Sequence, residues 1–345
     1  MRGEKEKEYF RDGQGTPLPQ GDWSLVFERS PGKLLEVKHL FAVLLLFALP
    51  VRSLQAQLAV PDDLVQAAEQ WAQENLDDSV LEALGQIDRD RVRQFLGEVQ
   101  RRLGSNSIYD LGSLNETALQ LLPVLEQFEE TQPYAVWLQT HLDYFDTADE
   151  LRREVTQLKP EPKTPATLPN PSPQLQRSVW VKQLAKRPLP PLAQAYLPQV
   201  KQIFAAERMP PELAWLAEVE SSFDPKARSP AGAAGLFQLM PATARTLNLA
   251  AWPRDERFQP EKNARAAARY LRSLYRHYGD WRLALAAYNS GETRVDRLLQ
   301  QNKAATFEAI ARFLPAETQM YVPKVEATLR KREGIVLTEV KLPKG

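Results

Sequence analysis

The chain has 345 residues, enough for two ordinary domains, and its 43% hydrophobic and 26% charged residues are typical of globular proteins. Lys plus Arg and Asp plus Glu both number 44, so no overall charge favours a nucleic acid or an anionic membrane surface as partner. Cysteine is absent and the three histidines lie far apart in sequence, so we expect no thiolate- or histidine-based metal site and catalysis that depends on carboxylates.

A short apolar run at residues 40–50 ("LFAVLLLFALP") predicts a secretory signal. Its ten apolar residues are too few to span a bilayer, which needs about 20, but they suit the central region of a signal peptide. Lys38 and His39 precede the run, and cleavage is expected after Ala56. We therefore expect residues 37–56 to be a signal peptide, and the mature protein to be periplasmic without a stable membrane anchor. The alternative is a buried core helix.

The residues before this run place it unusually deep in the chain for a signal peptide. They are polar, rich in Gly and Pro, and without clear periodicity. We expect residues 1–36 to be a non-native or disordered extension, with translation beginning near Val37. Sequencing the N-terminus of the precursor tests this, and a peptide detected from residues 4–27 would contradict it.

Residues 57–158 predict an α-helical domain of unknown role. In the stretch "RVRQFLGEVQRRLG" one face is apolar and the helix is expected to end at Gly104. No catalytic constellation occurs in this domain, and we interpret His141 as an ordinary surface or packing residue. The helices of residues 61–158 are a candidate binding surface for a cell-wall protein.

Prolines then divide the chain. Six of them fall between residues 160 and 173, which predicts a semi-rigid linker at residues 159–176. The second domain, residues 177–345, again shows helical periodicity, with Gly279 and Asp280 placed to end one helix and cap the next. Only residues 334–340 ("GIVLTEV") predict a short β-like tail. The expected fold class is mainly α: two helical domains joined by a Pro-rich linker.

Glu220 stands where the helical periodicity predicts an apolar residue. Leu213, Leu216, Ala217 and Glu220 span about 100° of one helix face, whereas Glu218 points about 160° away and is expected to be solvated. Burial raises the pKa of a carboxyl group, which leaves a proton available to a general acid that cleaves an acetal. The alternative is a structural glutamate that accepts hydrogen bonds from neighbouring hydroxyls or backbone amides.

Three further stretches follow in order after this position. They are "ESSFDPKARSPAGAAGLFQLMPATA" (220–244), "AAYNSG" (286–291) and "ETQMYVPKV" (317–325). Together they resemble the motifs of lytic transglycosylases with the soluble-type (SLT) catalytic domain, a lysozyme-like helical fold related to goose-type lysozyme. The resemblance covers about residues 197–330 and does not extend to residues 61–158.

The resemblance implies a role for each matching residue. Glu220 corresponds to the single catalytic glutamate, which acts first as acid and then as base. The positions that correspond to substrate-binding residues are Ser229, Gly235, Phe237, Gln238, Met240, Tyr288, Asn289, Glu317 and Tyr321. Phe237 takes a place often held by methionine and keeps an apolar wall.

From the residues alone, some of these positions have other readings. Tyr288 and Met240 also fit core packing, and Glu317 also fits a capping residue. We expect Trp215, Trp252 and Trp281 to be packing residues rather than sugar platforms.

The function implied by the resemblance is cleavage of the β-1,4 bond between N-acetylmuramic acid and N-acetylglucosamine in peptidoglycan. No water is consumed, and 1,6-anhydromuramic acid ends form. One alternative is a hydrolytic muramidase of the goose-type lysozyme kind. Another is a non-catalytic glycan-binding scaffold whose 61–158 helices recruit partners. Mass spectrometry of the products separates the first two, and intact motif residues speak against the third.

Overall fold

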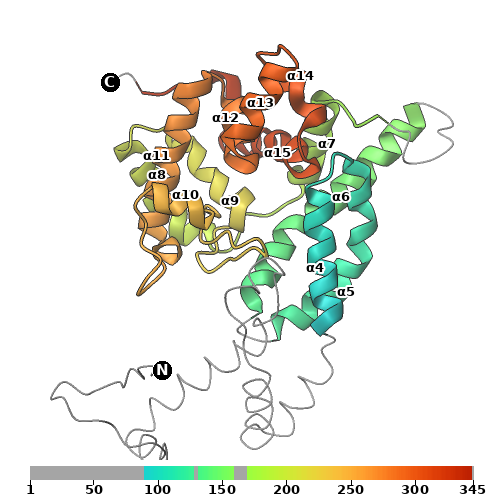
Figure 1. Ribbon diagram of the computed structural model, residues 1–345, viewed down its shortest axis with the longest axis horizontal. Helices are drawn as coiled ribbons and strands as arrows, with labels where there is room; N and C mark the ends of the chain where they lie inside the picture. Colours follow the sequence, from blue (N-terminus) through green and yellow to red (C-terminus); the bar gives the residue numbers. More distant parts are fainter. Residues whose placement is uncertain (1–88, 128–130, 159–168, 344–345) are drawn as a thin grey trace, which may run out of the picture. The chain divides into compact units, whose positions relative to one another are not determined.

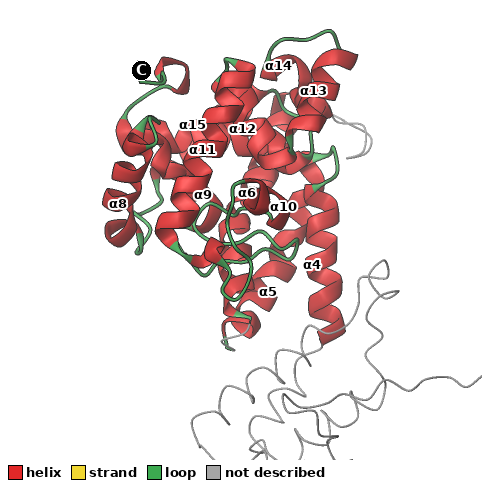
Figure 2. Ribbon diagram, turned by 60° about the vertical axis from the view of Figure 1, so that its left-hand side comes forward, coloured by secondary structure: helices red, strands yellow, loops and turns green. Residues whose placement is uncertain are grey.

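The computed structural model describes residues 89–127, 131–158 and 169–343 (Figure 1). The expected extension 1–36 and signal peptide 37–56 lie outside these ranges, as do residues 57–88 and most of the expected linker. The described residues are mainly α-helical, as predicted, and contain no β-strand beyond two isolated bridges in the loop before α10 (Figure 2). None of their helices is both long and apolar enough to cross a membrane.

The helices before and just after the expected linker pack around one core. They are α4 (Arg89–Leu103), a 3₁₀ helix (Ile108–Leu114), α5 (Asn115–Glu126), α6 (Gln132–Leu158) and α7 (Pro173–Ala185). The apolar face predicted for α4 lies on this core, with Phe95, Val99 and Leu103 buried. Gly104 follows the last residue of α4, as expected. α7 begins inside the segment assigned to the linker, where the Ser172 hydroxyl accepts the Leu175 amide.

The remaining helices surround a second core. They are α8 (Ala193–Ala206), a 3₁₀ helix (Pro211–Trp215), α9 (Leu216–Ser221), α10 (Pro241–Thr246), a 3₁₀ helix (Glu256–Phe258), α11 (Pro260–Tyr278), α12 (Trp281–Ser290), α13 (Glu292–Gln301), α14 (Phe307–Ile310) and a 3₁₀ helix (Ala311–Phe313). Gly279 adopts the left-handed conformation that ends α11, and the Asp280 side chain accepts the Leu283 amide at the start of α12. Both boundaries were predicted from the sequence.

α15 (Ala316–Glu333) lies between the two cores and is buried on both sides. Every residue from 318 to 329 is buried, which is the pattern of a helix covered all round. Ala316, Met320 and Ala327 pack with α4–α7, whereas Tyr321 and Val325 pack with the helices that follow α7. All the described residues belong to one compact unit. The helices on both sides of the linker therefore share α15, and their division into two domains stays a prediction.

The expected β-like tail is wrong. Residues Leu337–Glu339 form a 3₁₀ helix instead, and Leu337 and Val340 pack on the second core. A strand needs a neighbour for its backbone groups, and the described residues supply no sheet edge beside this segment. The apolar residues of the tail are used for packing rather than for pairing.

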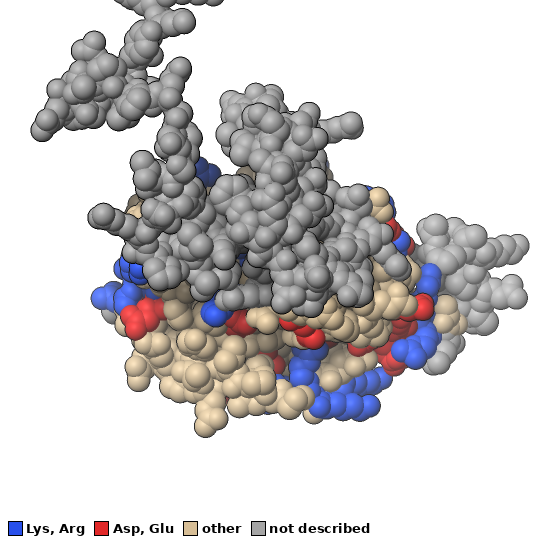
Figure 3. Space-filling model, turned by 90° about the horizontal axis from the view of Figure 1, so that it is seen from below, with Lys and Arg blue, Asp and Glu red and all other residues tan. Residues whose placement is uncertain are grey.

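Acidic and basic side chains are interspersed on the described surface. On the face seen in Figure 3, groups of both signs lie side by side between larger areas of uncharged residues. This agrees with the equal numbers of acidic and basic residues in the whole sequence.

Candidate active site

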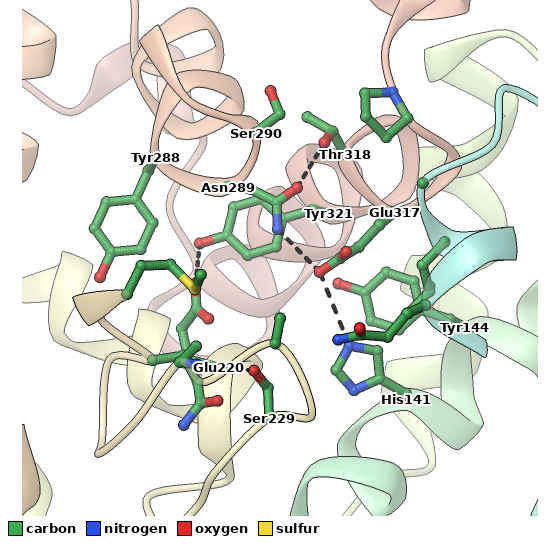
Figure 4. Close-up of a pocket in the computed structure, with 18 of the residues that line it drawn as sticks. His141, Tyr144, Glu220, Ser229, Tyr288, Asn289, Ser290, Glu317, Thr318 and Tyr321 are labelled. Atoms are coloured by element: carbon green, nitrogen blue, oxygen red, sulfur yellow. Dashed lines mark hydrogen bonds and ion pairs between the residues drawn. The ribbon is translucent and has the colours of Figure 1, made fainter. Parts of the chain in front are cut away.

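A pocket of about 420 Å³ opens between α4 and α6 on one side and α9, α12 and α15 on the other. Two carboxylates line it, Glu220 from the last turn of α9 and Glu317 from the first turn of α15 (Figure 4). Tyr288, Asn289 and Tyr321 also line it. The motifs that lie up to a hundred residues apart in sequence therefore meet in one cavity.

Glu220 lies on the apolar stripe that the sequence predicted. Leu213, Leu216 and Ala217 are fully buried on the same side of the segment. The Tyr321 hydroxyl donates a hydrogen bond of 2.6 Å to Glu220 Oε1. The pKa of Glu220 is raised to about 8. Burial is the main cause and the charge of Glu317 adds to it, whereas the Tyr321 hydrogen bond and Lys324 act in the opposite direction. At pH 7 the protonated form prevails by about ten to one.

Tyr321 and Tyr288 are held as proton donors. Burial and the nearby Glu220 carboxyl raise the pKa of each phenol well above its usual value. The Tyr288 hydroxyl donates to the Phe237 carbonyl oxygen at 2.7 Å, so it ties α12 to the loop before α10. Tyr288 is thus both packed and at the edge of the pocket, where its ring contacts Tyr270 with centroids 5.5 Å apart.

Glu317 forms a hydrogen-bonded group with the third motif. Asn289 Nδ2 donates to Glu317 Oε1 at 3.1 Å, and Asn289 Oδ1 accepts the Thr318 hydroxyl at 2.6 Å. Burial raises the pKa of Glu317, but His141 and Asn289 outweigh it and hold the pKa below its usual value. The two carboxyl groups of the pocket are therefore in different states: Glu220 keeps its proton near neutral pH and Glu317 is ionised.

The glycine-bearing loop between α9 and α10 forms the floor beside Glu220. Ser229 accepts the Ala233 amide at 3.0 Å through its hydroxyl and lines the pocket. Gln238 has φ 44°, and its Nε2 donates to the carbonyls of Ala227 and Gly235. Gln238 lines the pocket, and its Oε1 is buried with no hydrogen-bond donor among the described residues. Met240 is 42% exposed on the rim.

Two of the residues expected to bind substrate support the loop from behind instead. A Cβ on Gly235 would lie 2.0 Å from the Arg257 carbonyl oxygen, and its φ is 82°, so glycine is required by backbone packing. The Phe237 side chain is fully buried and stacks on Phe204 with centroids 5.3 Å apart. Neither lines the pocket. The expectation that Phe237 forms an apolar cleft wall is wrong, because its ring packs in the core against Phe204.

Glu218 is the clearest error of the helix-face prediction. We expected a solvated residue, but its side chain is 4% exposed and forms a bidentate pair with Arg332, at 2.7 and 2.9 Å. The C-terminal part of α15 covers this side of α9. A short helix enclosed on both faces has no solvated stripe, so the polar residue on its second face is paired rather than exposed.

The prediction for the three tryptophans is only partly right. Trp215 and Trp281 are buried, at 5% and 4% exposure, and pack in the second core as expected. Trp252 is 86% exposed, so it is not a packing residue. It lies in the irregular segment between α10 and α11, where no helix covers it.

The sequence analysis did not assign to the site the residues that α4 and α6 contribute. His141, Trp137 and Tyr144 of α6 line the pocket, and His141 Nε2 lies 3.9 Å from Glu317 Oε1 (Figure 4). His141, interpreted from the sequence as an ordinary surface or packing residue, is a packing residue against Trp137 and Tyr144 that also lines the pocket. The spacing of these aromatic residues on one helix face was the one available signal, and it fits packing equally well. No cluster of three or more potential metal ligands occurs in the described ranges.

The motifs, the helical fold and this pocket define an SLT-type domain. The sequence model described as "Transglycosylase SLT domain" matches residues 201–311, and this part of the chain belongs to that family. The membrane-bound lytic murein transglycosylase D of Escherichia coli (strain K12) is 39% identical over 141 residues, which are 39% of this chain and 31% of that protein. The soluble lytic murein transglycosylase of Salmonella typhimurium is 39% identical over 122 residues, 32% of this chain and 19% of that protein.

The chain thus spans less than a third of the length of these two curated relatives. Among solved structures, the 70 kDa soluble lytic transglycosylase of Escherichia coli aligns over 82% of this chain and 56% of its own. The identity is 22% and the TM-score is 0.37, a likeness too weak to place individual residues.

Proposed function

We propose that this protein is a lytic transglycosylase that cleaves the β-1,4 bond between N-acetylmuramic acid and N-acetylglucosamine in peptidoglycan and leaves 1,6-anhydromuramic acid ends. The observation that supports this best is the protonated Glu220 in a pocket that SLT-type motifs line. A general acid that keeps its proton at neutral pH is what protonation of a departing sugar oxygen requires.

In the proposed reaction Glu220 donates its proton to the glycosidic oxygen as the bond from this oxygen to C1 of the muramic sugar breaks. The 2-acetamido group of the same sugar stabilises the positive charge that develops at C1. The Glu220 carboxylate then takes the proton of the C6 hydroxyl, whose oxygen attacks C1 and closes the anhydro ring. Glu220 ends the cycle protonated, so one carboxyl group is sufficient and no water, metal or cofactor takes part.

The surrounding groups support this use of one carboxyl group. The Tyr321 hydroxyl donates a hydrogen bond to Glu220 Oε1 and holds this oxygen in position. Gln238 lines the same pocket and is the side chain of the loop that we expect to contact an acetamide or a sugar hydroxyl. Asn289, tied at both ends to Glu317 and Thr318, is fixed before substrate arrives, which makes its contacts with a sugar more effective.

Digestion of purified peptidoglycan sacculi tests the proposal. We expect soluble fragments whose muramic acid residues are 1,6-anhydro ends, identified by mass spectrometry. In water enriched in ¹⁸O these fragments should contain no ¹⁸O, because the C6 oxygen and not water attacks C1. Fragments with reducing ends that contain ¹⁸O would sink the transglycosylase mechanism.

A hydrolytic muramidase is the second candidate, and one observation favours it. Glu317 is a second carboxylate on the same pocket, and it is ionised, as a base that activates water must be. Against this role, Glu317 Oε1 already accepts a hydrogen bond from Asn289 and faces His141, so this oxygen is not free to bind a water molecule. The ¹⁸O experiment separates the two reactions.

The proposed substrate lies outside the cytoplasm, so the proposal includes export. Cleavage after Ala56 would release a periplasmic protein without a stable anchor, and a mature N-terminus at Gln57 would support this. A cell-wall protein remains the proposed partner of the helices in residues 61–158, and a non-catalytic scaffold is disfavoured by the intact Glu220 site.

A further inference from the structure

The wall of the pocket contributed by α6 lies outside residues 201–311, which match the family. Its polar group nearest to the motif residues is His141. We propose that His141 is a positioning residue that holds the Glu317 carboxylate against Asn289, and so keeps the site around Glu220 assembled. This inference rests on the proposed function for its activity readout.

The His141 ring is fixed from behind by its own helix. Nδ1 lies 2.7 Å from the Trp137 carbonyl oxygen and 3.2 Å from the Thr140 hydroxyl oxygen. The ring packs against those of Trp137 and Tyr144, with centroids at 4.4 and 5.3 Å, and the side chain is 9% exposed. The ring therefore has one orientation, set by a hydrogen bond and two aromatic neighbours.

This orientation determines which nitrogen faces the pocket. A carbonyl oxygen only accepts, so Nδ1 donates its proton to Trp137, and Nε2 is left to face Glu317 Oε1 at 3.9 Å. Without a proton, Nε2 would turn a lone pair toward a carboxylate. With a proton, the pair attracts at ion-pair distance in a nearly buried site, where such an interaction is stronger than at the surface.

Glu317 transmits this interaction to the two groups that act on substrate. Its Oε1 accepts a hydrogen bond from Asn289 Nδ2. This bond orients the Asn289 amide so that Nδ2 faces Glu317 and Oδ1 faces Thr318. Its charge also raises the pKa of Glu220. His141 is therefore linked to Asn289 through one hydrogen bond and to Glu220 through the electric field of Glu317.

Other ionisable groups face the same part of the pocket and contribute to any pH effect. They come from five elements and are Tyr144 of α6, Glu220 of α9, Tyr288 of α12, Arg294 of α13 and Tyr321 of α15. Lys324 of α15 does not line the pocket, but its charge acts on Glu220 and Glu317. Burial raises the pKa of the three tyrosines well above the usual value. Burial lowers the pKa of Lys324, whose positive charge acts on Glu220 and Glu317 in the same direction as His141.

A double-mutant cycle in the full chain tests the inference. The variants are His141→Gln, Glu317→Gln and the pair together, and Gln139→Ala on the exposed side of α6 is the matched control. The rate of release of soluble muropeptides from sacculi is measured across the pH range of activity. We expect His141→Gln to lower kcat about tenfold with little change in KM, since a charge-assisted contact is lost but the pocket remains. In the Glu317→Gln background the same change should have almost no further effect.

The pH profile distinguishes positioning from a purely structural role. Without His141, the charge of Glu317 is less compensated, so Glu220 should keep its proton to higher pH and Glu317 should become protonated at higher pH. Both limbs of the pH profile should therefore move to higher pH in His141→Gln, whereas Gln139→Ala should leave the profile and kcat unchanged. Multiplicative effects of the two substitutions, or an unmoved profile, would overturn the inference.

Failure of the proposed function has a different signature. If the native protein releases no muropeptides, the activity proposal fails before any variants are compared. The same cycle is then read from urea unfolding of the four proteins. A coupling between His141→Gln and Glu317→Gln supports the pairing, and additive effects overturn it.

Discussion

Tyr321 and Glu220, a hundred residues apart in sequence, are joined by a hydrogen bond of 2.6 Å between the phenol and Oε1. The bond opposes the effect of burial on the glutamate, because a donor to the carboxylate stabilises its charged form. Glu220 is therefore balanced between two influences. Burial favours the protonated form at neutral pH, and the hydrogen bond from Tyr321 stabilises the carboxylate that forms when the proton is given up. A group that acts first as acid and then as base needs both forms.

Replacing Glu220 by Gln should reduce the release of muropeptides from sacculi by about a thousandfold, because the only protonated carboxyl group of the pocket is lost. Glu212→Gln, in the 3₁₀ helix that precedes α9, is the control and should retain normal activity. The two variants are compared in the same digestion assay. A Glu220→Gln protein that keeps more than a tenth of native activity would refute the acid role.

Replacing Tyr321 by Phe should move the high-pH limb of the activity profile to higher pH. Removing the hydrogen bond takes away an influence that lowers the pKa of Glu220, so this pKa should rise above about 8 and the acid form should persist to higher pH. The pH dependence of kcat measures the shift. A limb that moves to lower pH would show that Tyr321 does not stabilise the carboxylate.

Glu220 should also make the folded protein less stable as pH rises. Its folded pKa of about 8 exceeds the model value of 4.5, so between these values the native state binds more protons than the unfolded state. Stability is then lost progressively from about pH 4.5 to pH 8, by up to about 4 kcal/mol. Glu220→Gln removes this loss. Urea unfolding should show little difference between the variant and the native protein at pH 5 and a more stable variant at pH 8.

Replacing Glu218 by Gln should lower the free energy of unfolding by about 3 kcal/mol, because Arg332 is left buried at 9% exposure without its charge partner. The activity per folded molecule should be retained, since Glu218 does not line the pocket. Glu154→Gln, which breaks a pair with the exposed Lys182, is the control and should change stability little. Equal effects of the two substitutions in urea unfolding would contradict the buried pair.

Replacing Gly235 by Ala should destabilise the protein by more than about 3 kcal/mol, because the added Cβ meets the Arg257 carbonyl. Gly279→Ala is the matched control: φ is also positive but nothing lies within 4 Å of the added carbon, so only about 1 kcal/mol of backbone strain is expected. The difference in urea midpoint between the two variants isolates the steric clash.

Local patterns predicted the features of this structure that depend on neighbours in sequence. The helical fold class, the apolar stripe before Glu220 and the boundary at Gly279 and Asp280 all depend on residues within two turns of one another. The ordered motifs also identified the residues that meet in the pocket, because their spacing follows a known family.

The errors arose where distant segments decide the environment. Glu218 is buried because Arg332, more than a hundred residues later, covers it. Gly235 is required by a carbonyl of Arg257, which the loop sequence does not reveal. His141 lines the pocket because α6 packs beside α15, and a single helix face cannot show what will lie opposite to it. Periodicity shows that one face of a helix is buried, but it does not show which segment packs against that face.

The position of α15 between the two cores sets the size of the smallest fragment with a complete site. A fragment that begins at residue 177 would contain every matched motif, yet it would leave Ala316, Met320 and Ala327 bare and separate the buried Lys324 from Asp143. It would also lack one side of the cavity. Work on the isolated SLT segment should therefore begin no later than α4, because the boundary of the family match is not the boundary of the folded unit.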